Sequence, residues 1–216
     1  MSVLTVLAGP NGAGKSYFSG FFLETGWIKT QPVNIDALES YVDPSRIPND
    51  PMRYGRCIEE QVNKIFNELC CEAIQNKRDF SFESNLRLDQ LGCVKFFDSA
   101  KYEINLIYIF LDNIEISKRR VQIRISEGGH IVGDDSILEN FSQGLKNLDD
   151  SVSEYNWNHV YIVDNTKEIK TKGDVLTLLL EMENERIIQV SDSFLTDNRK
   201  ILLPKICKLI EERIKL

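Results

Sequence analysis

The chain has 216 residues, of which 42% are hydrophobic and 27% charged, a composition typical of a globular protein with a substantial core. Its formal net charge of −7 argues against general nucleic-acid binding, which needs a basic face. No apolar run approaches the ~20 residues of a membrane span, and the first strand leaves no room for a signal peptide. We therefore expect a cytoplasmic protein without nucleic acid or membrane partners. Five cysteines without a C-x-x-C pair are expected to be reduced, mostly buried thiols.

The first element predicted is a short apolar strand over residues 2–8, which leads into the segment Gly9-Pro10-Asn11-Gly12-Ala13-Gly14-Lys15-Ser16. This is a complete phosphate-binding loop, G-x-x-x-x-G-K-[ST], followed by a helix from about residue 16 to 23. Glycines let the backbone N–H groups surround an anion, and the helix N-terminus adds its positive dipole. We predict nucleotide binding by residues 9–16 and the adjacent Tyr17, with Lys15 on the outer phosphates and Ser16 on Mg²⁺.

Strands and helices alternate along the rest of the chain, which predicts βαβ units and a parallel sheet flanked by helices. Three prolines are expected to keep residues 37–53 irregular, and residues 175–190 are compatible with a hairpin or with a helix and a strand. Strands are predicted at 33–35, 80–83, 103–111 and 160–163, and helices at 54–76, 88–100, 114–125, 134–148 and 200–216.

The expected organisation is a P-loop kinase-like core over residues 1–170 and a small C-terminal extension over residues 171–216 that packs on the same domain. Within the core, Gly128-Gly129-His130 interrupts two helices and is interpreted as a hinge for a lid over about residues 127–148. A lid would exclude water from a phosphoryl-transfer site.

Several predicted strands end in a polar residue, and in parallel sheets ligands bind beyond these carboxyl ends. Asp36, Glu83, Asp112 and Asp164 are therefore expected to converge on the phosphate loop. Asp36 is the candidate for accepting a proton from an acceptor hydroxyl, Glu83 and Asn85 for binding substrate, and Asp112 for the metal shell. The alternative for Asp36 and for Glu83 is capping of a following helix.

Arg120 and Arg124 lie four residues apart on a predicted helix and therefore share one face. Guanidinium groups near a phosphate loop can stabilise charge in the transition state, so both are catalytic candidates. The alternative is a solvated basic face.

In their order and spacing, several segments resemble the zeta-toxin family of small-molecule kinases over about residues 2–165. They are Gly9 to Ser16, Asn34-Ile35-Asp36, Phe82-Glu83-Ser84-Asn85-Leu86, Leu106 to Asp112, Arg120-Val121-Gln122-Ile123-Arg124, Gly128-Gly129-His130 and Leu145-Lys146-Asn147-Leu148.

The resemblance implies a P-loop kinase that uses ATP and Mg²⁺ and phosphorylates a hydroxyl of a nucleotide sugar such as UDP-N-acetylglucosamine. It makes Asp36 the acceptor-side carboxylate, Glu83 and Asn85 substrate contacts, and Lys15 with the lid arginines the phosphate ligands. It also implies a possible antitoxin partner that covers the nucleotide site.

Two departures from the family pattern bear on activity. Asn140 precedes Phe141 where the family usually carries arginine, unless Lys146 or Arg119 substitutes, and Asn85 stands where a threonine is common. The leading hypothesis is an ATP-dependent kinase for a small-molecule hydroxyl. The rival is a nucleotide-binding protein with little transfer that acts through a protein partner; an ABC-type ATPase lacks support because no L-S-G-G-Q-like signature is present.

Overall fold

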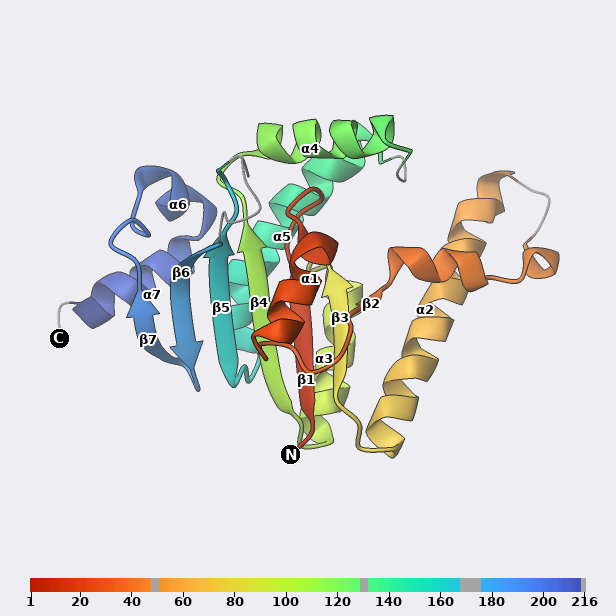
Figure 1. Cartoon of the computed structure of the whole chain (residues 1–216), viewed down its shortest axis with the longest axis horizontal. Helices are drawn as coiled ribbons and strands as arrows, with labels where there is room; N and C mark the ends of the chain where they lie inside the picture. The colour runs from red at the N-terminus through yellow and green to blue at the C-terminus, as the bar shows by residue number, and fades with distance from the viewer. Residues whose placement is uncertain (48–50, 129–131, 168–175, 215–216) are drawn as a thin grey trace.

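The computed structural model describes residues 1–47, 51–128, 132–167 and 176–214, and its centre is a seven-stranded sheet (Figure 1). The strands are β1 (Val3–Ala8), β2 (Val33–Asn34), β3 (Phe80–Ser84), β4 (Glu103–Phe110), β5 (His159–Asp164), β6 (Thr177–Glu183) and β7 (Arg186–Val190). Their spatial order is β2-β3-β1-β4-β5-β6-β7. The first five strands are parallel, whereas β6 and β7 form an antiparallel hairpin on β5. The predicted α/β class is confirmed, and residues 175–190 contain the hairpin.

The helices lie between and around these strands, with α1 in front of the sheet and α3 and α5 behind it in Figure 1. They are α1 (Lys15–Glu24), α2 (Pro51–Gln75), α3 (Leu88–Ser99), α4 (Ile114–Ser126), α5 (Asp134–Glu154), α6 (Asp197–Leu202) and α7 (Pro204–Ile214), with 3₁₀ turns η1 (Asp36–Tyr41) and η2 (Pro44–Arg46). In the described part of the chain no helix has both the length and the apolarity of a membrane span.

The core forms where the central strands are covered on both faces. All six residues of β1 are buried, as are seven of the eight in β4, which explains their continuous apolar sequence. The five cysteines are free thiols, and three of them are buried. The buried apolar side chains on both faces of these strands stabilise the sheet. Polar residues are found beyond the carboxyl ends of the strands.

The boundaries of three predicted elements differ from the structure. Pro51 is the first residue of α2 rather than an interruption, because a helix leaves its first N–H groups unbonded and proline has none to lose. The helix predicted to end at residue 148 continues to Glu154. The C-terminal helix is divided at Leu203, one residue before Pro204, since the residue before proline disfavours helical geometry.

A buried arginine of the C-terminal segment binds the ends of two central strands. Arg199 on α6, only 4% exposed, donates from Nε and Nη2 to the two carboxylate oxygens of Asp112 at 3.0 Å each. Its Nη2 also donates to Asp164 at 3.1 Å. Both carboxylates, expected at the phosphate loop, thus bind Arg199, and neither lines the cavity that contains Lys15. A metal role for Asp112 stays a prediction.

Replacement of Arg199 by methionine should strongly destabilise the fold, because it leaves Asp112 and Asp164 partly buried without a cation. We expect the free energy of unfolding to fall by about 3 kcal/mol in urea denaturation. Arg78→Met is the matched control, since Arg78 pairs with Glu72 at a site where both side chains are more than half exposed, and it should cost no more than ~1 kcal/mol. Equal losses in the two variants would contradict a structural role for the Arg199 cluster.

Candidate functional site

The phosphate loop occupies the turn from β1 to α1, as its sequence predicts (Figure 1). Gly9 has φ 151°, and a Cβ there would come within 2.6 Å of the Ile109 carbonyl oxygen on β4. Gly14 is left-handed at φ 97° and is the N-cap of α1. Only glycine fits these two positions without a steric clash or backbone strain. The two glycines therefore allow the loop backbone to wrap closely around an anion.

Lys15, the first residue of α1, extends back across the loop. Its Nζ donates to the carbonyl oxygens of Gly9 at 2.7 Å and Pro10 at 3.2 Å, and to Asn85 Oδ1 at 2.8 Å. Burial lowers the pKa of Lys15 to about 8, against the opposing attraction of Glu83 and Asp36. Because only neutral oxygens accept hydrogen bonds from this buried ammonium group, an anion such as a phosphate would stabilise its charge further.

Ser16 and Glu83 form a direct pair beside Lys15. The Ser16 hydroxyl donates to Glu83 Oε2 at 2.9 Å, and Glu83 is only 7% exposed. Burial raises the pKa of Glu83, while the hydrogen bond from Ser16 and the charge of Lys15 lower it. Two adjacent hard oxygen donors suit Mg²⁺, which keeps most of its ligands as water and phosphate. Asp112, the other residue expected in the metal shell, binds Arg199 through both oxygens and does not line the cavity that contains Ser16 and Glu83.

Strand register explains why Glu83 lies beside the loop. Parallel pairing sets Leu7 opposite Glu83 and Ala8 opposite Ser84, so β3 ends where the phosphate loop begins. The capping alternative for Glu83 is therefore wrong, because its carboxylate binds Ser16. The capping alternative for Asp36 is wrong as well: the cap of η1 is Ile35, and Asn34 Oδ1 accepts the N–H of Ala37.

Asn85 is held by a strained turn directly after β3. Leu86 has φ 61°, rare for a residue with a side chain, yet it is fully buried. Its N–H donates to Ser84 Oγ and its carbonyl accepts from Asn147 Nδ2, each at 2.7 Å. These two bonds fix the turn that directs the Asn85 amide to Lys15. Asn147 belongs to a family block but had no role assigned from sequence.

Helix α5 contacts the site at two further points. Gly144 lies so close to the turn that a Cβ would be 2.8 Å from the Asn85 carbonyl oxygen. Asn140, at the position of the missing arginine, donates to Asn11 Oδ1 in the phosphate loop at 2.9 Å. Lys146, which could substitute for that arginine, pairs with Asp150 and lines neither cavity of the site described below.

Two neighbouring cavities meet at this site. The first, which we call the loop cavity, has a volume of about 400 Å³. The second, which we call the side cavity, has a volume of about 600 Å³ and reaches α5. Asp36, Asn11, Asn85 and Gln90 line both cavities. The remaining residues of the loop cavity are Gly12, Ala13, Gly14, Lys15, Ser16, Tyr17, Asn34, Ile35, Glu83, Ser84, Arg120, Ile123, Arg124 and Glu127.

Both candidate arginines line the loop cavity from α4. Arg120 Nη2 donates to the carbonyl of Lys167 at 3.0 Å and its Nη1 approaches that of Gly12 at 3.4 Å. Arg124 is close enough to Lys15 to lower the lysine pKa. Arg124 is exposed although it lines the cavity, so the catalytic role of the two arginines stays a prediction. The hinge residues Gly129 and His130 lie outside the described residues.

Sequence reasoning missed Gln90, which accepts from Ser84 Oγ at 2.6 Å and lines both cavities. Because polar residues are common within helices, nothing in the sequence marked Gln90 as a site residue.

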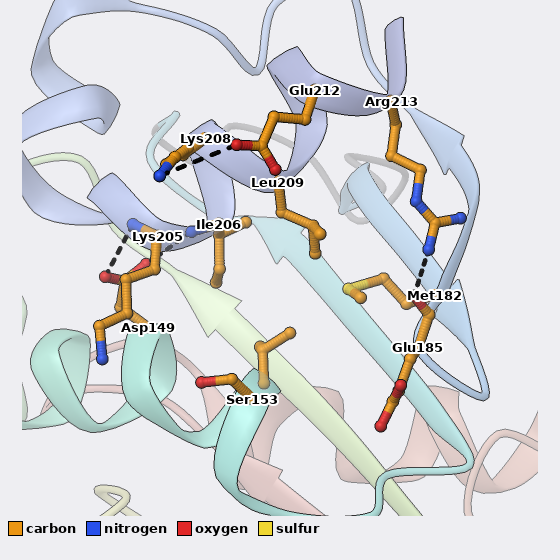
Figure 2. A pocket seen from close by; sticks show the side chains of 11 residues that line it. Asp149, Ser153, Met182, Glu185, Lys205, Ile206, Lys208, Leu209, Glu212 and Arg213 are labelled. Carbon is orange, nitrogen blue, oxygen red and sulfur yellow. Dashed lines mark hydrogen bonds and ion pairs between the residues drawn. The ribbon is translucent and has the colours of Figure 1, made fainter. Parts of the chain in front are cut away.

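A further cavity, about 410 Å³, lies between α5, β6 and α7 (Figure 2) and contains none of the predicted site residues. There, the Asp149 carboxylate accepts the N–H groups of Lys205 and Ile206 and so anchors the start of α7. Within the described ranges no group of three or more His, Cys, Asp or Glu residues is arranged to hold a metal.

A mostly parallel sheet with a phosphate loop after β1, and with a lysine, a serine and a buried glutamate at its edge, defines a P-loop kinase-like fold. The zeta toxin family model matches residues 2–172. The chain belongs to the zeta toxin family.

Solved structures share this fold at low sequence identity. The PezAT chromosomal toxin-antitoxin system of Streptococcus pneumoniae is similar at 13% identity and a TM-score of 0.53, over 100% of this chain and 88% of that chain. The AvrRxo1-ORF1:-ORF2 structure with ATP is similar at 12% identity and a TM-score of 0.60, over 96% of this chain and 64% of that chain. No curated protein matches the chain.

Replacement of Gly144 by alanine tests the close approach of α5 to the Asn85 turn. The added methyl group would press on the Asn85 carbonyl, so we expect the free energy of unfolding to fall by about 1–3 kcal/mol. Gly92→Ala in α3 is the matched control, because a Cβ there meets no atom within 4 Å. That variant should gain up to about 1 kcal/mol from helix propensity. Urea denaturation measures both values, and a similar gain for Gly144→Ala would contradict the contact.

Proposed function

We propose that the protein is an ATP-dependent kinase that transfers the γ-phosphate to a hydroxyl of a small metabolite. The observation that carries the proposal is the position of Asp36, which lines both the loop cavity and the side cavity. A phosphate donor in the first cavity and an acceptor in the second would meet at this carboxylate. Family membership and the kinase-like fold support the same class of reaction.

The loop cavity supplies the groups that a triphosphate requires. Lys15, Arg120 and Arg124 are its cations, and the loop backbone from Asn11 to Gly14, which also lines it, would surround the remaining phosphate oxygens. Tyr17 and Ile123 are 67% and 52% exposed and offer apolar surface to a base. The AvrRxo1 complex of the same fold contains ATP, which supports ATP as the donor.

Mg²⁺ would bind at Ser16, with Glu83 accepting from its hydroxyl or from a water of the ion. The bound ion would neutralise charge on the β- and γ-phosphates. Ser16 belongs to the first turn of α1 and Glu83 to the end of β3, so the hydrogen bond between them joins two elements of the core.

The proposed transfer step assigns a role to each of these side chains. Asp36 accepts the proton of the acceptor hydroxyl, whose oxygen forms a bond to the γ-phosphorus while the bond to the β-phosphate oxygen breaks and ADP leaves. Lys15 and the two arginines stabilise the charge that develops on the γ-phosphate oxygens. The phosphorylated acceptor then leaves through the side cavity.

The family resemblance makes a nucleotide sugar, such as UDP-N-acetylglucosamine, the first acceptor class to test. It also favours cytoplasmic action and an antitoxin that covers the nucleotide site, and the PezAT relative is a toxin-antitoxin system. The C-terminal segment after residue 170 would stabilise the kinase core through the ion pairs that Arg199 forms with Asp112 and Asp164.

A second candidate is a nucleotide-binding protein with weak or no transfer that acts through a protein partner. The observation that favours it is Asn140, an amide that binds Asn11 where the family usually carries a phosphate-binding arginine. One cation fewer would slow transfer more than it weakens nucleotide binding.

Transfer of labelled γ-phosphate to small hydroxyl compounds distinguishes the two candidates when Asp36→Asn and Lys15→Ala are compared with wild type. Asp36→Asn should lower kcat at least about 100-fold, because the base is lost, and leave the ATP dissociation constant unchanged. Lys15→Ala should weaken ATP binding as well as transfer.

Glu39→Gln is the control for loss of a carboxylate in η1, since Glu39 is exposed and lines neither cavity. It should behave as wild type. Nucleotide binding without phosphate transfer to any metabolite would support the second candidate and refute the kinase.

A further inference from the structure

The side cavity differs sharply in charge from the loop cavity. Among the described residues that line it, four are carboxylates, namely Asp36, Glu59, Asp89 and Glu139, and Arg87 is the single cation. The loop cavity balances Asp36, Glu83 and Glu127 with Lys15, Arg120 and Arg124. An acceptor in the side cavity therefore meets an excess of negative charge.

Arg87, the one cation among the described residues that line the side cavity, is already neutralised. Arg87 Nη2 pairs with Glu59 at 2.9 Å, and its Nε pairs with Asp89 at 3.1 Å. Lys15 lines the loop cavity and not the side cavity. Neither cation is placed to receive a diphosphate in the side cavity, and a phosphate that displaced Glu59 or Asp89 would lose an existing ion pair.

The wall that α5 contributes is polar but carries no cation. Its lining residues recur at intervals of three and four, so they form one face of the helix. This face consists of Ser136, Glu139, Asn140, Gln143 and Asn147. Hydroxyl and amide groups hydrogen-bond sugar hydroxyls in either direction, and carboxylates accept hydrogen bonds from hydroxyl or ammonium groups.

We propose that the side cavity accepts a neutral or cationic hydroxyl compound, such as a free sugar, a polyol or an aminosugar, and disfavours an acceptor that carries a diphosphate. The inference rests on the proposed kinase function and specifies its acceptor. It departs from the nucleotide sugar that family resemblance implies, because it follows the charges of this cavity. Amides and carboxylates select hydroxyls and ammonium groups, whereas a diphosphate requires unpaired arginine or lysine.

Three acceptors that share a pyranose ring and differ in charge test the proposal. They are glucosamine, N-acetylglucosamine and UDP-N-acetylglucosamine, each supplied with Mg²⁺ and γ-labelled ATP to the full-length protein. We expect kcat/KM for glucosamine or N-acetylglucosamine to exceed that for the UDP-sugar at least about tenfold. Added salt should raise KM for glucosamine and leave it unchanged for N-acetylglucosamine, since only the charged acceptor is subject to screening.

The variant Glu139→Lys reverses one charge on the cavity wall. It should lower kcat/KM for glucosamine and raise it for the UDP-sugar by about tenfold each. Asp135→Lys is the matched control, because Asp135 is exposed on the same helix and does not line the side cavity; it should change neither value by more than about twofold.

The outcomes separate this inference from the function on which it depends. A wild-type protein that phosphorylates UDP-N-acetylglucosamine best is a kinase with a different acceptor class, which overturns the inference and leaves the kinase intact. A protein that binds a fluorescent ATP analogue and transfers phosphate to none of the three acceptors overturns this inference. The kinase proposal itself is refuted only when no compound of the wider hydroxyl panel described above receives phosphate.

Discussion

The site depends on the parallel pairing of β1 with β3. That pairing sets Leu7 opposite Glu83 and Ala8 opposite Ser84, so two segments separated by more than seventy residues end side by side. The phosphate loop emerges from one strand, and Glu83 and Asn85 emerge from the other. A slip of one residue would turn Glu83 to the opposite face of the sheet, and both the Ser16 pair and the Lys15 contact would be lost.

The carboxyl edge of the sheet contains three regions that differ in the arrangement of their charged side chains. The loop cavity holds a desolvated Lys15 among neutral oxygens, which leaves its charge available to phosphate. At the ends of β4 and β5, one and two strands away from β1, Arg199 neutralises Asp112 and Asp164 and ties α6 to the core. The side cavity keeps its carboxylates in excess. Strand ends that look equivalent in sequence therefore serve nucleotide binding, structural bracing and the proposed acceptor recognition.

Features that depend on local motifs and strand order could be predicted from the sequence. Features that depend on contacts between residues far apart in the chain could not. The phosphate loop, the parallel sheet and the approach of Asp36, Glu83 and Asn85 follow from motif spacing and strand order. The diversion of Asp112 to Arg199 could not be foreseen, because the two lie 87 positions apart and no pattern links them. Gln90, Asn147 and the Gly144 contact depend on how α3 and α5 pack. The catalytic roles of Asp36, Arg120 and Arg124 stay predictions.

A crystal structure with Mg²⁺ and a non-hydrolysable ATP analogue tests the central proposal most directly. The proposed kinase predicts that the γ-phosphate contacts Lys15 Nζ, that the ion binds Ser16 Oγ, and that the γ-phosphorus faces Asp36 at the junction of the two cavities. A triphosphate that turns away from Asp36, so that no acceptor in the side cavity could reach the γ-phosphorus, would contradict it.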